Sequence, residues 1–226
     1  MPGAVILGAG PGLGRAIARR FAREGLSISL IARNRATVES VAATLADLEA
    51  PVLGLSADCT DESALRTALE KTYAAFGVPE VVVYNAAIIQ ADTVGELSVS
   101  DHLDAWAVNV VGAHTAAAQV IPKMTRSGSG TFLVTGGMPA PKREYVSLSL
   151  GKAGLRTLVD LLDQEYLSAG IHVAAVTVDG PIAPGTAFDP DDIAEHYWTL
   201  HSQPRELWQR EIVHTENSMP PSRLRY

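Results

Sequence analysis

A glycine-rich loop near the start of the chain is the feature that most constrains the fold. The apolar residues 4–7 predict a short strand, the run Gly8-Ala9-Gly10-Pro11-Gly12-Leu13-Gly14 follows directly, and residues 13–24 predict an amphipathic helix. Glycines let the backbone approach a pyrophosphate closely, and a helix N-terminus offers free N–H groups and a favourable dipole. An ordinary turn is the alternative, but the order strand, loop, helix favours a dinucleotide-binding loop. Its candidate cofactor contacts are Gly8, Gly10, Gly12, Leu13 and Gly14.

The same alternation of strand and helix patterns continues along the chain. Short β-branched or apolar runs predict strands at 4–7, 27–31, 52–56, 81–84, 130–135 and 172–176, with a short seventh strand at 211–214. Stretches of helical period predict helices at 13–24, 36–49, 61–76, 101–126 and 148–168. This order is typical of βαβ units. It predicts one α/β domain, a doubly wound Rossmann-type parallel sheet of about seven strands with helices on both faces, which binds ligands at the carboxyl ends of its strands.

The last part of the chain differs in composition. Gly180-Pro181, Pro184-Gly185 and Asp189-Pro190-Asp191 predict a loop, and a short helix is expected at 191–200. We therefore expect residues 1–200 to form the dinucleotide-binding domain, with 180–200 as a short substrate loop. Residues 201–226 are expected to form a C-terminal strand and arm, whose polar, Pro-rich tail at 214–226 packs as an arm or frays.

The composition argues against several classes of function. The formal net charge is −7 and no basic run appears, which disfavours a nucleic-acid or anionic-membrane partner. Cys59 is the only cysteine, and the six histidines have no metal-ligand spacing, so neither an intramolecular disulfide nor a metal site is expected. No segment approaches the roughly 20 apolar residues of a membrane span, and Met1-Pro2-Gly3 does not begin a signal peptide. We expect a cytoplasmic protein.

The end of the second predicted strand indicates which nicotinamide cofactor binds. A carboxylate there would bind the ribose hydroxyls of NAD(H), but the residues are Ala32, Arg33, Asn34 and Arg35. The Arg33 guanidinium can pair with a 2′-phosphate in a forked geometry, and Arg15, just after the last loop glycine, offers a second contact. A solvated strand end is the alternative. The residues favour NADP(H) over NAD(H).

The spacing of three glycines adds a resemblance to a known family. Gly8, Gly12 and Gly14 fit the pattern Gly-x-x-x-Gly-x-Gly, with Leu7 where a Thr is usual. In this the chain resembles the short-chain dehydrogenases/reductases, and the resemblance extends to about residue 200. It implies a nicotinamide-dependent oxidoreductase that acts on a small-molecule carbonyl or hydroxyl substrate.

Three further positions match the family's motifs. Asp58 lies in a segment that resembles Asp-Val-Thr-Asp, where it would face the adenine; a turn or cap is its other interpretation. Asn85, in a segment like Asn-Asn-Ala-Gly, would tie the fourth strand to its neighbours. Asn109 matches the asparagine that in relatives holds a helix kink and a water of the proton relay, although a plain core hydrogen bond is also compatible with it.

The family's catalytic segment is matched only in part. Its Tyr-x-x-x-Lys aligns with Lys152, which in relatives holds the ribose hydroxyls, but Leu148 stands four residues earlier in place of Tyr. Its Ser-Ser at the end of the fifth strand aligns with Gly136 and Gly137, which leaves Thr135 as the nearest hydroxyl. A leucine cannot transfer a proton, so the resemblance implies a divergent member with a non-standard proton donor.

Three interpretations of the function remain open on this basis. The first is an NADP(H)-dependent oxidoreductase whose proton comes from Tyr145, Thr135, a water or the substrate, although Tyr145 also fits a loop or interface aromatic. The second is a cofactor-binding pseudoenzyme that acts as a sensor or partner subunit, and the third is an isomerase that uses the cofactor transiently. The resemblance also implies a homodimer or homotetramer through the helices at 101–126 and 148–168, which are apolar around most of their circumference.

Overall fold

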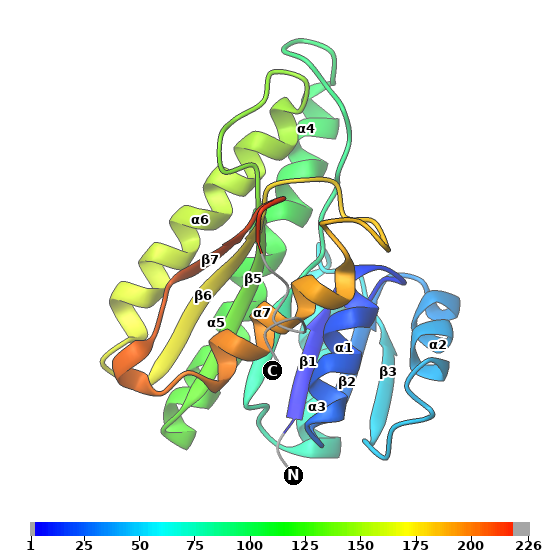
Figure 1. The fold of residues 1–226 in the computed structure, drawn as a ribbon, viewed down its shortest axis with the longest axis vertical. Coiled ribbons are helices and arrows are strands. Elements are labelled where there is room, and N and C mark those ends of the chain that lie inside the picture. Colours follow the sequence, from blue (N-terminus) through cyan, green and yellow to red (C-terminus); the bar gives the residue numbers. More distant parts are fainter. Residues whose placement is uncertain (1–2, 219–226) are drawn as a thin grey trace.

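All seven predicted strands join one parallel sheet in the computed structural model, which describes residues 3–218 (Figure 1). The order across the sheet is β3-β2-β1-β4-β5-β6-β7. The strands are β1 (Gly3–Leu7), β2 (Ser27–Ala32), β3 (Val52–Ser56), β4 (Val81–Tyr84), β5 (Gly130–Gly137), β6 (Ile171–Val178) and β7 (Glu211–His214). The predicted seventh strand at 211–214 is confirmed, since it pairs in parallel with β6.

Helices cover both faces of the sheet. They are α1 (Leu13–Arg23), α2 (Arg35–Ala43), α3 (Glu62–Phe76), α4 (Val99–Trp106), α5 (Gly112–Ser127), α6 (Val146–Tyr166) and α7 (Pro190–Ser202), with a short turn of 3₁₀ helix, η2 (Arg205–Leu207). Helices α1, α2 and α7 share one apolar core with the sheet, and α3, α5 and α6 share the core on its other face. The doubly wound, single-domain α/β fold is confirmed. No helix within residues 3–218 is long and apolar enough to cross a membrane.

Some boundaries differ from those predicted, for local reasons. The helix predicted at 36–49 ends at Ala43, because the N–H groups of Thr44, Leu45 and Ala46 turn back to carbonyls three residues earlier. The helix predicted at 101–126 begins at Val99, where Ser98 and Asp101 form a capping box. A π-helical turn, η1 (Ala107–Val111), then separates α4 from α5. The helix predicted at 61–76 begins at Glu62, because Asp61 is its N-cap and its carboxylate accepts from Ala64 N at 3.0 Å.

The strand order reverses between β1 and β4, and this crevice positions the site. Leu7, the last residue of β1, lies in register with Ile31 of β2 on one side and with Tyr84 of β4 on the other. The three strands therefore end at the same level, and the loops that follow them diverge. In doubly wound sheets the ligand binds at such a point, outside the carboxyl ends of the strands.

Candidate functional site

The glycine loop is held on one side against the segment that follows β4 and is open on the other. Gly8 has φ +89°, and a Cβ there would meet the Ala86 backbone, with Ala86 Cα at 2.7 Å. Gly14 is packed against the backbone of Gly8 and Ala9, with Ala9 Cα 2.9 Å from the position of a Cβ. Gly10 and Gly12, by contrast, have nothing within 4 Å of that position. This open, side-chain-free surface at the start of α1 fits a bound dinucleotide, whose pyrophosphate would meet the helix N-terminus.

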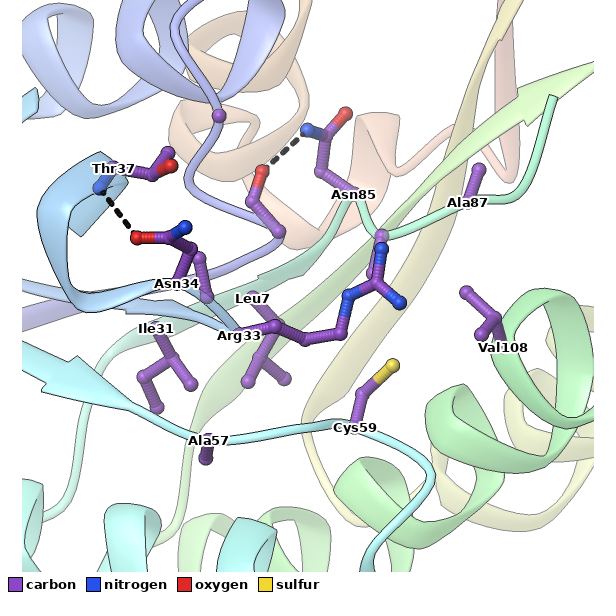
Figure 2. Close-up of a pocket in the computed structure, with 14 residues that line it drawn as sticks. Leu7, Ile31, Arg33, Asn34, Thr37, Ala57, Cys59, Asn85, Ala87 and Val108 are labelled. Carbon is purple, nitrogen blue, oxygen red and sulfur yellow. Dashed lines mark hydrogen bonds between the residues drawn. The ribbon is translucent and has the colours of Figure 1, made fainter.

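A cavity of about 300 Å³ lies beside the loop, over the ends of β1, β2 and β4. Gly8, Gly10, Arg33, Asn85 and Cys59 are among its lining residues. Figure 2 shows the Arg33 side chain reaching across this cavity, toward the segment that carries Asn85 and Ala87. No hydrogen bond or ion pair to another described residue holds its guanidinium group. The cavity thus combines a glycine loop with one uncommitted cation.

The other predicted cofactor contacts at this end have protein partners. Arg15 donates to the Pro11 carbonyl at 3.2 Å and to Asp191 of α7 at 3.4 Å. Asp58 accepts from both the backbone N–H and the hydroxyl of Thr60, each at 2.8 Å. Neither side chain lines the cavity, which Ala57 and Cys59 border instead. The turn-forming interpretation accounts for the geometry of Asp58.

A chain of buried hydrogen bonds links α7 to the glycine loop. Thr135 Oγ1 donates its one hydrogen to Asn85 Oδ1 at 2.7 Å, and Asn85 Nδ2 donates to the Gly8 carbonyl at 2.9 Å. Thr135 Oγ1 also lies 2.7 Å from the hydroxyl of Tyr197, which must therefore be the donor to it. Asn85 accordingly ties β4 to the loop after β1. The hydroxyl of Thr135 is therefore engaged both as a donor, to Asn85, and as an acceptor, from Tyr197.

Lys152 and Asn109 are buried close to this series of hydrogen bonds. Lys152 Nζ, in a residue only 5% exposed, donates to the Thr135 carbonyl at 2.6 Å. Burial, and secondarily the charge of Arg156, lowers the pKa of Lys152 to about 8. Asn109 lies in the π-helical turn, accepts from Ile88 N at 2.9 Å and donates to Ile88 O at 3.2 Å. A π-helical turn within a helix often marks a functional position.

A second cavity, of about 670 Å³, opens beside these residues. Gly12 and Leu13 of the loop border it, as do Asn85, Thr135 and Lys152. Leu148, Tyr145 and the pair Gly136-Gly137 also contribute to its wall, and the segment from Val178 to Ile182 closes the far side. Its wall is mostly apolar, with a buried lysine at its base. Such a cavity is typical of a small-molecule site.

The position of Tyr145 depends on a buried carboxylate. Asp92, 1% exposed, accepts from Ser147 N at 2.9 Å and from Ser147 Oγ at 2.8 Å, at the start of α6. Its own backbone N–H donates to Glu144 O, and its carbonyl accepts from Val146 N. A carboxylate at a helix N-terminus is favoured by the dipole. Asp92 thus fixes the segment that carries Tyr145 against the cavity.

Two residues, Tyr197 and Arg156, contribute to the candidate site although the sequence motifs did not indicate them. Tyr197 is fully buried and hydrogen-bonds Thr135, and Arg156 holds the carbonyls of Gly137 and Met138 at 2.9 and 3.0 Å. Tyr197 lies on the apolar stripe of α7 with Ile193, Ala194 and Leu200, and a buried phenol needs a partner. The spacing of these apolar residues was the sequence signal that could have indicated a buried Tyr197. Within residues 3–218, no three His, Cys, Asp or Glu side chains could hold a metal.

Known proteins resemble this chain along nearly its whole length. A family model described as short chain dehydrogenase matches residues 3–187. An uncharacterized oxidoreductase of Staphylococcus saprophyticus is 26% identical over 227 residues, which cover 93% of this chain and 95% of that protein. An uncharacterized short-chain type dehydrogenase/reductase of Sinorhizobium fredii is 29% identical over 181 residues, covering 77% of this chain and 72% of that one.

Solved structures share the fold. A short-chain dehydrogenase from Rhodopseudomonas palustris aligns with a TM-score of 0.86 and 22% identity, over 94% of this chain and 97% of that one. An alcohol dehydrogenase from Thermococcus sibiricus, complexed with 5-hydroxy-NADP, aligns with a TM-score of 0.86 and 24% identity, over 97% and 99%. At this level of identity the likeness establishes the arrangement of strands and helices around the two cavities.

Proposed function

The chain belongs to the short-chain dehydrogenase family, and from that premise we propose that it transfers a hydride between NADP(H) and a carbonyl or hydroxyl substrate. The observation that carries the proposal is the continuity of the two cavities, which share Asn85 and Ala87 in their walls. One lies over the ends of β1 and β2, and the other contains Lys152. A dinucleotide extended along the loop would span both.

Each part of the site has a role in this proposal. The bound nicotinamide supplies or accepts the hydride. Gly10 and Gly12 leave room for the pyrophosphate, and Lys152 holds the ribose hydroxyls beside the second cavity. Asn109 keeps the segment at Ile88 in place. The apolar wall formed by Leu148 and Val178 excludes water from the reacting carbon.

The proposed activity is tested by the oxidation of NADPH in the presence of carbonyl probes. We expect consumption of NADPH with 4-nitrobenzaldehyde, at a lower rate than in a relative that carries a phenol at the position of Leu148. A protein that binds NADPH tightly and reduces no aldehyde or ketone in a broad panel would instead match a cofactor-binding pseudoenzyme.

We propose NADP(H) rather than NAD(H) as the cofactor. At the end of β2, Ala32 offers no carboxylate to a ribose 2′-hydroxyl, and the Arg33 guanidinium is free to pair with a 2′-phosphate. Similar solved structures complexed with NADP or 5-hydroxy-NADP are consistent with this choice.

Arg33→Ala should weaken NADPH binding by about 1–3 kcal/mol, or roughly 5–150-fold, and leave NADH binding almost unchanged, because only NADPH carries the 2′-phosphate. Fluorescence titration with both cofactors measures this. Arg35→Ala is the matched control, since Arg35 is exposed and pairs with Glu39. Equal affinities of the wild type for the two cofactors would contradict the proposal.

We also propose that the chain assembles as a homodimer or homotetramer through α4, α5 and α6. Exposed apolar residues gather there, and a groove of about 450 Å³ runs between α5 and α6. Its wall includes Trp106, Val110, His114 and Leu161. An apolar face of this kind on a helix pair is usually covered by another chain.

Light scattering should report a dimer or tetramer at micromolar concentration, and Leu161→Glu should shift it toward monomer. Leu161 is 57% exposed on this face, so a carboxylate there would be buried unpaired in the assembly. Leu207→Glu, at a 64% exposed leucine in η2, is the control and should leave the mass unchanged. A wild-type monomer at micromolar concentration would rule out the assembly.

A further inference from the structure

We propose that Lys152 is itself the acid that delivers the proton to the substrate oxygen, a role that rests on the proposed function. In this role the ammonium group replaces the phenol that Leu148 cannot provide. Lys152 would then have two tasks, to hold the ribose and to donate a proton.

The position of Lys152 suits direct donation. Its Nζ reaches the end of β5 and donates one hydrogen to the Thr135 carbonyl, and Thr135 is the only partner of Nζ among the described residues. An ammonium has three hydrogens, so two remain for the ribose and the substrate in the cavity that Lys152 lines. A cofactor and a carbonyl bound there would both lie beside the same nitrogen.

Other hydroxyls near this nitrogen are less suited to the task. Thr135 donates its single hydrogen to Asn85, and Tyr197 is buried behind it with its hydroxyl directed at Thr135. Tyr145 lines the cavity but is the N-cap residue of α6, seven residues before Lys152. It is the rival donor that an experiment must separate from Lys152.

The surroundings of Lys152 make its proton available near neutral pH. The other titratable groups that line its cavity are Lys142 and Tyr145 before α6 and Asp179 after β6, and Arg156 lies one turn later on α6, whose acidic residues Asp160, Asp163 and Glu165 are two to four turns away. Burial and the Arg156 charge lower the pKa to about 8. An acid with a pKa near the working pH donates well and is readily reprotonated. An ordinary exposed lysine, with a pKa of about 10.4, would be a weaker acid.

The proton and electron balance of the step is complete. Bound NADPH would supply the hydride that forms the new C–H bond and would be oxidised to NADP⁺, while the carbonyl π pair moves to oxygen. One Nζ–H bond of Lys152 breaks and an O–H bond forms, which leaves a neutral amine and the product alcohol. The amine keeps its hydrogen bond to the Thr135 carbonyl and regains a proton from solvent. In the oxidative direction the neutral amine accepts the proton from the alcohol.

The acidity of Lys152 can be measured without turnover. The chain has four lysines, Lys71, Lys123, Lys142 and Lys152, so a protein grown with lysine labelled at the ε-carbon with ¹³C gives at most four NMR signals. We expect one signal, absent in Lys152→Arg, to titrate with a midpoint near 8. A Lys152 signal that remains charged up to pH 10 would overturn the proposal.

Kinetics with NADPH and 4-nitrobenzaldehyde then link that group to catalysis. Because the donor must be protonated, the reduction rate should fall about tenfold per pH unit above the same midpoint. Lys152→Arg keeps the charge and can still bind the ribose but cannot release a proton near neutrality. We expect it to bind NADPH within a few-fold of wild type and to lose about 10²–10⁴-fold in turnover. Lys71→Arg, at an exposed lysine, is the matched control.

Two further variants keep the proposal falsifiable if arginine does not fit. Lys152→Ala should be inactive and should regain turnover with added ethylamine but not with ethanol. If turnover is lost in Tyr145→Phe and kept in Lys152→Arg, the proton comes from Tyr145 and the assignment of this role to Lys152 is wrong. A wild type that binds NADPH but reduces no carbonyl probe at any pH would instead overturn the proposed function, and the proton donor with it.

Discussion

Gly8→Ala should destabilise the fold, whereas Gly10→Ala should leave the fold intact and weaken cofactor binding. The two glycines lie two residues apart in the same loop, but their surroundings differ. At Gly8 the backbone is left-handed, and a methyl group would collide with the backbone of Ala86 after β4. At Gly10 the methyl group would project into open space on the side where the pyrophosphate is proposed to bind. The same substitution therefore separates a packing role from a binding role.

The size of the Gly8 effect follows from two costs. A non-glycine residue in the left-handed region costs about 1–2 kcal/mol, and overpacking against backbone costs about 1–3 kcal/mol more. For a chain of this size the melting temperature should fall by roughly 4–20 °C. Gly10→Ala should melt within about 2 °C of wild type, since a surface change away from special features shifts stability by at most about 0.5 kcal/mol.

Thermal melting and NADPH titration of both variants test the pair together. Gly10→Ala should bind NADPH at least tenfold more weakly, because the added methyl group keeps the phosphate from the N–H groups of the loop. A Gly10→Ala variant with wild-type affinity would show that the dinucleotide does not lie against this loop. A Gly8→Ala variant with wild-type stability would mean that the loop can withdraw from Ala86.

The order of strands, helices and loop was predictable because it depends on local patterns. Short apolar runs that alternate with helical stretches are typical of parallel pairing, and the glycine loop indicated the carboxyl edge of the sheet as the place where a ligand is expected. The boundaries were less predictable. Helix α2 ends in a tight turn at Thr44, although the helical sequence pattern continues to residue 49. Strand β5 was expected to end at Thr135, but it continues because Gly136 and Gly137 pair with Thr177 and Val178 of β6.

The site was predictable as a set of positions but not as a set of hydrogen bonds. The sequence indicated Thr135 as the hydroxyl nearest to the two glycines that stand in place of the family's serines. Its availability depends on Asn85 and Tyr197, which lie 50 residues before it and 62 after it in the chain. Arg15, which the sequence offered as a second phosphate contact, also donates to Asp191, 176 residues away. Partners at such separations follow from tertiary packing, which residue patterns do not specify.

Leu148→Tyr combined with Gly137→Ser should raise the turnover of generic carbonyls, by up to about 10²-fold, if a phenol supported by a serine donates the proton better than Lys152 alone. Leu148 lines the cavity one helical turn before Lys152, so a phenol there would lie beside the ammonium group. The ammonium charge would favour the phenolate and bring the phenol, with a reference pKa of about 10, closer to the working pH. At Gly137 a new Cβ would be 3.6 Å from Lys152 Cε and 3.7 Å from Val178 O, an ordinary contact. The serine hydroxyl can therefore enter the cavity without displacing either.

Two control variants separate the effect of the added tyrosine and serine hydroxyls from the effect of the added side-chain volume. Leu148→Phe with Gly137→Ser fills the same volume without the phenolic hydroxyl and should stay near the wild-type rate. Gly136→Ser moves the serine by one residue, where its Cβ would overlap Thr177 and lie 3.0 Å from Thr177 Cα, so it should destabilise the sheet instead of assisting catalysis. Steady-state rates with NADPH and 4-nitrobenzaldehyde, together with NADPH affinity, measure the outcome. If the tyrosine–serine variant folds, binds NADPH normally and reduces the aldehyde no faster than the phenylalanine control, then proton donation is not the step that limits this enzyme.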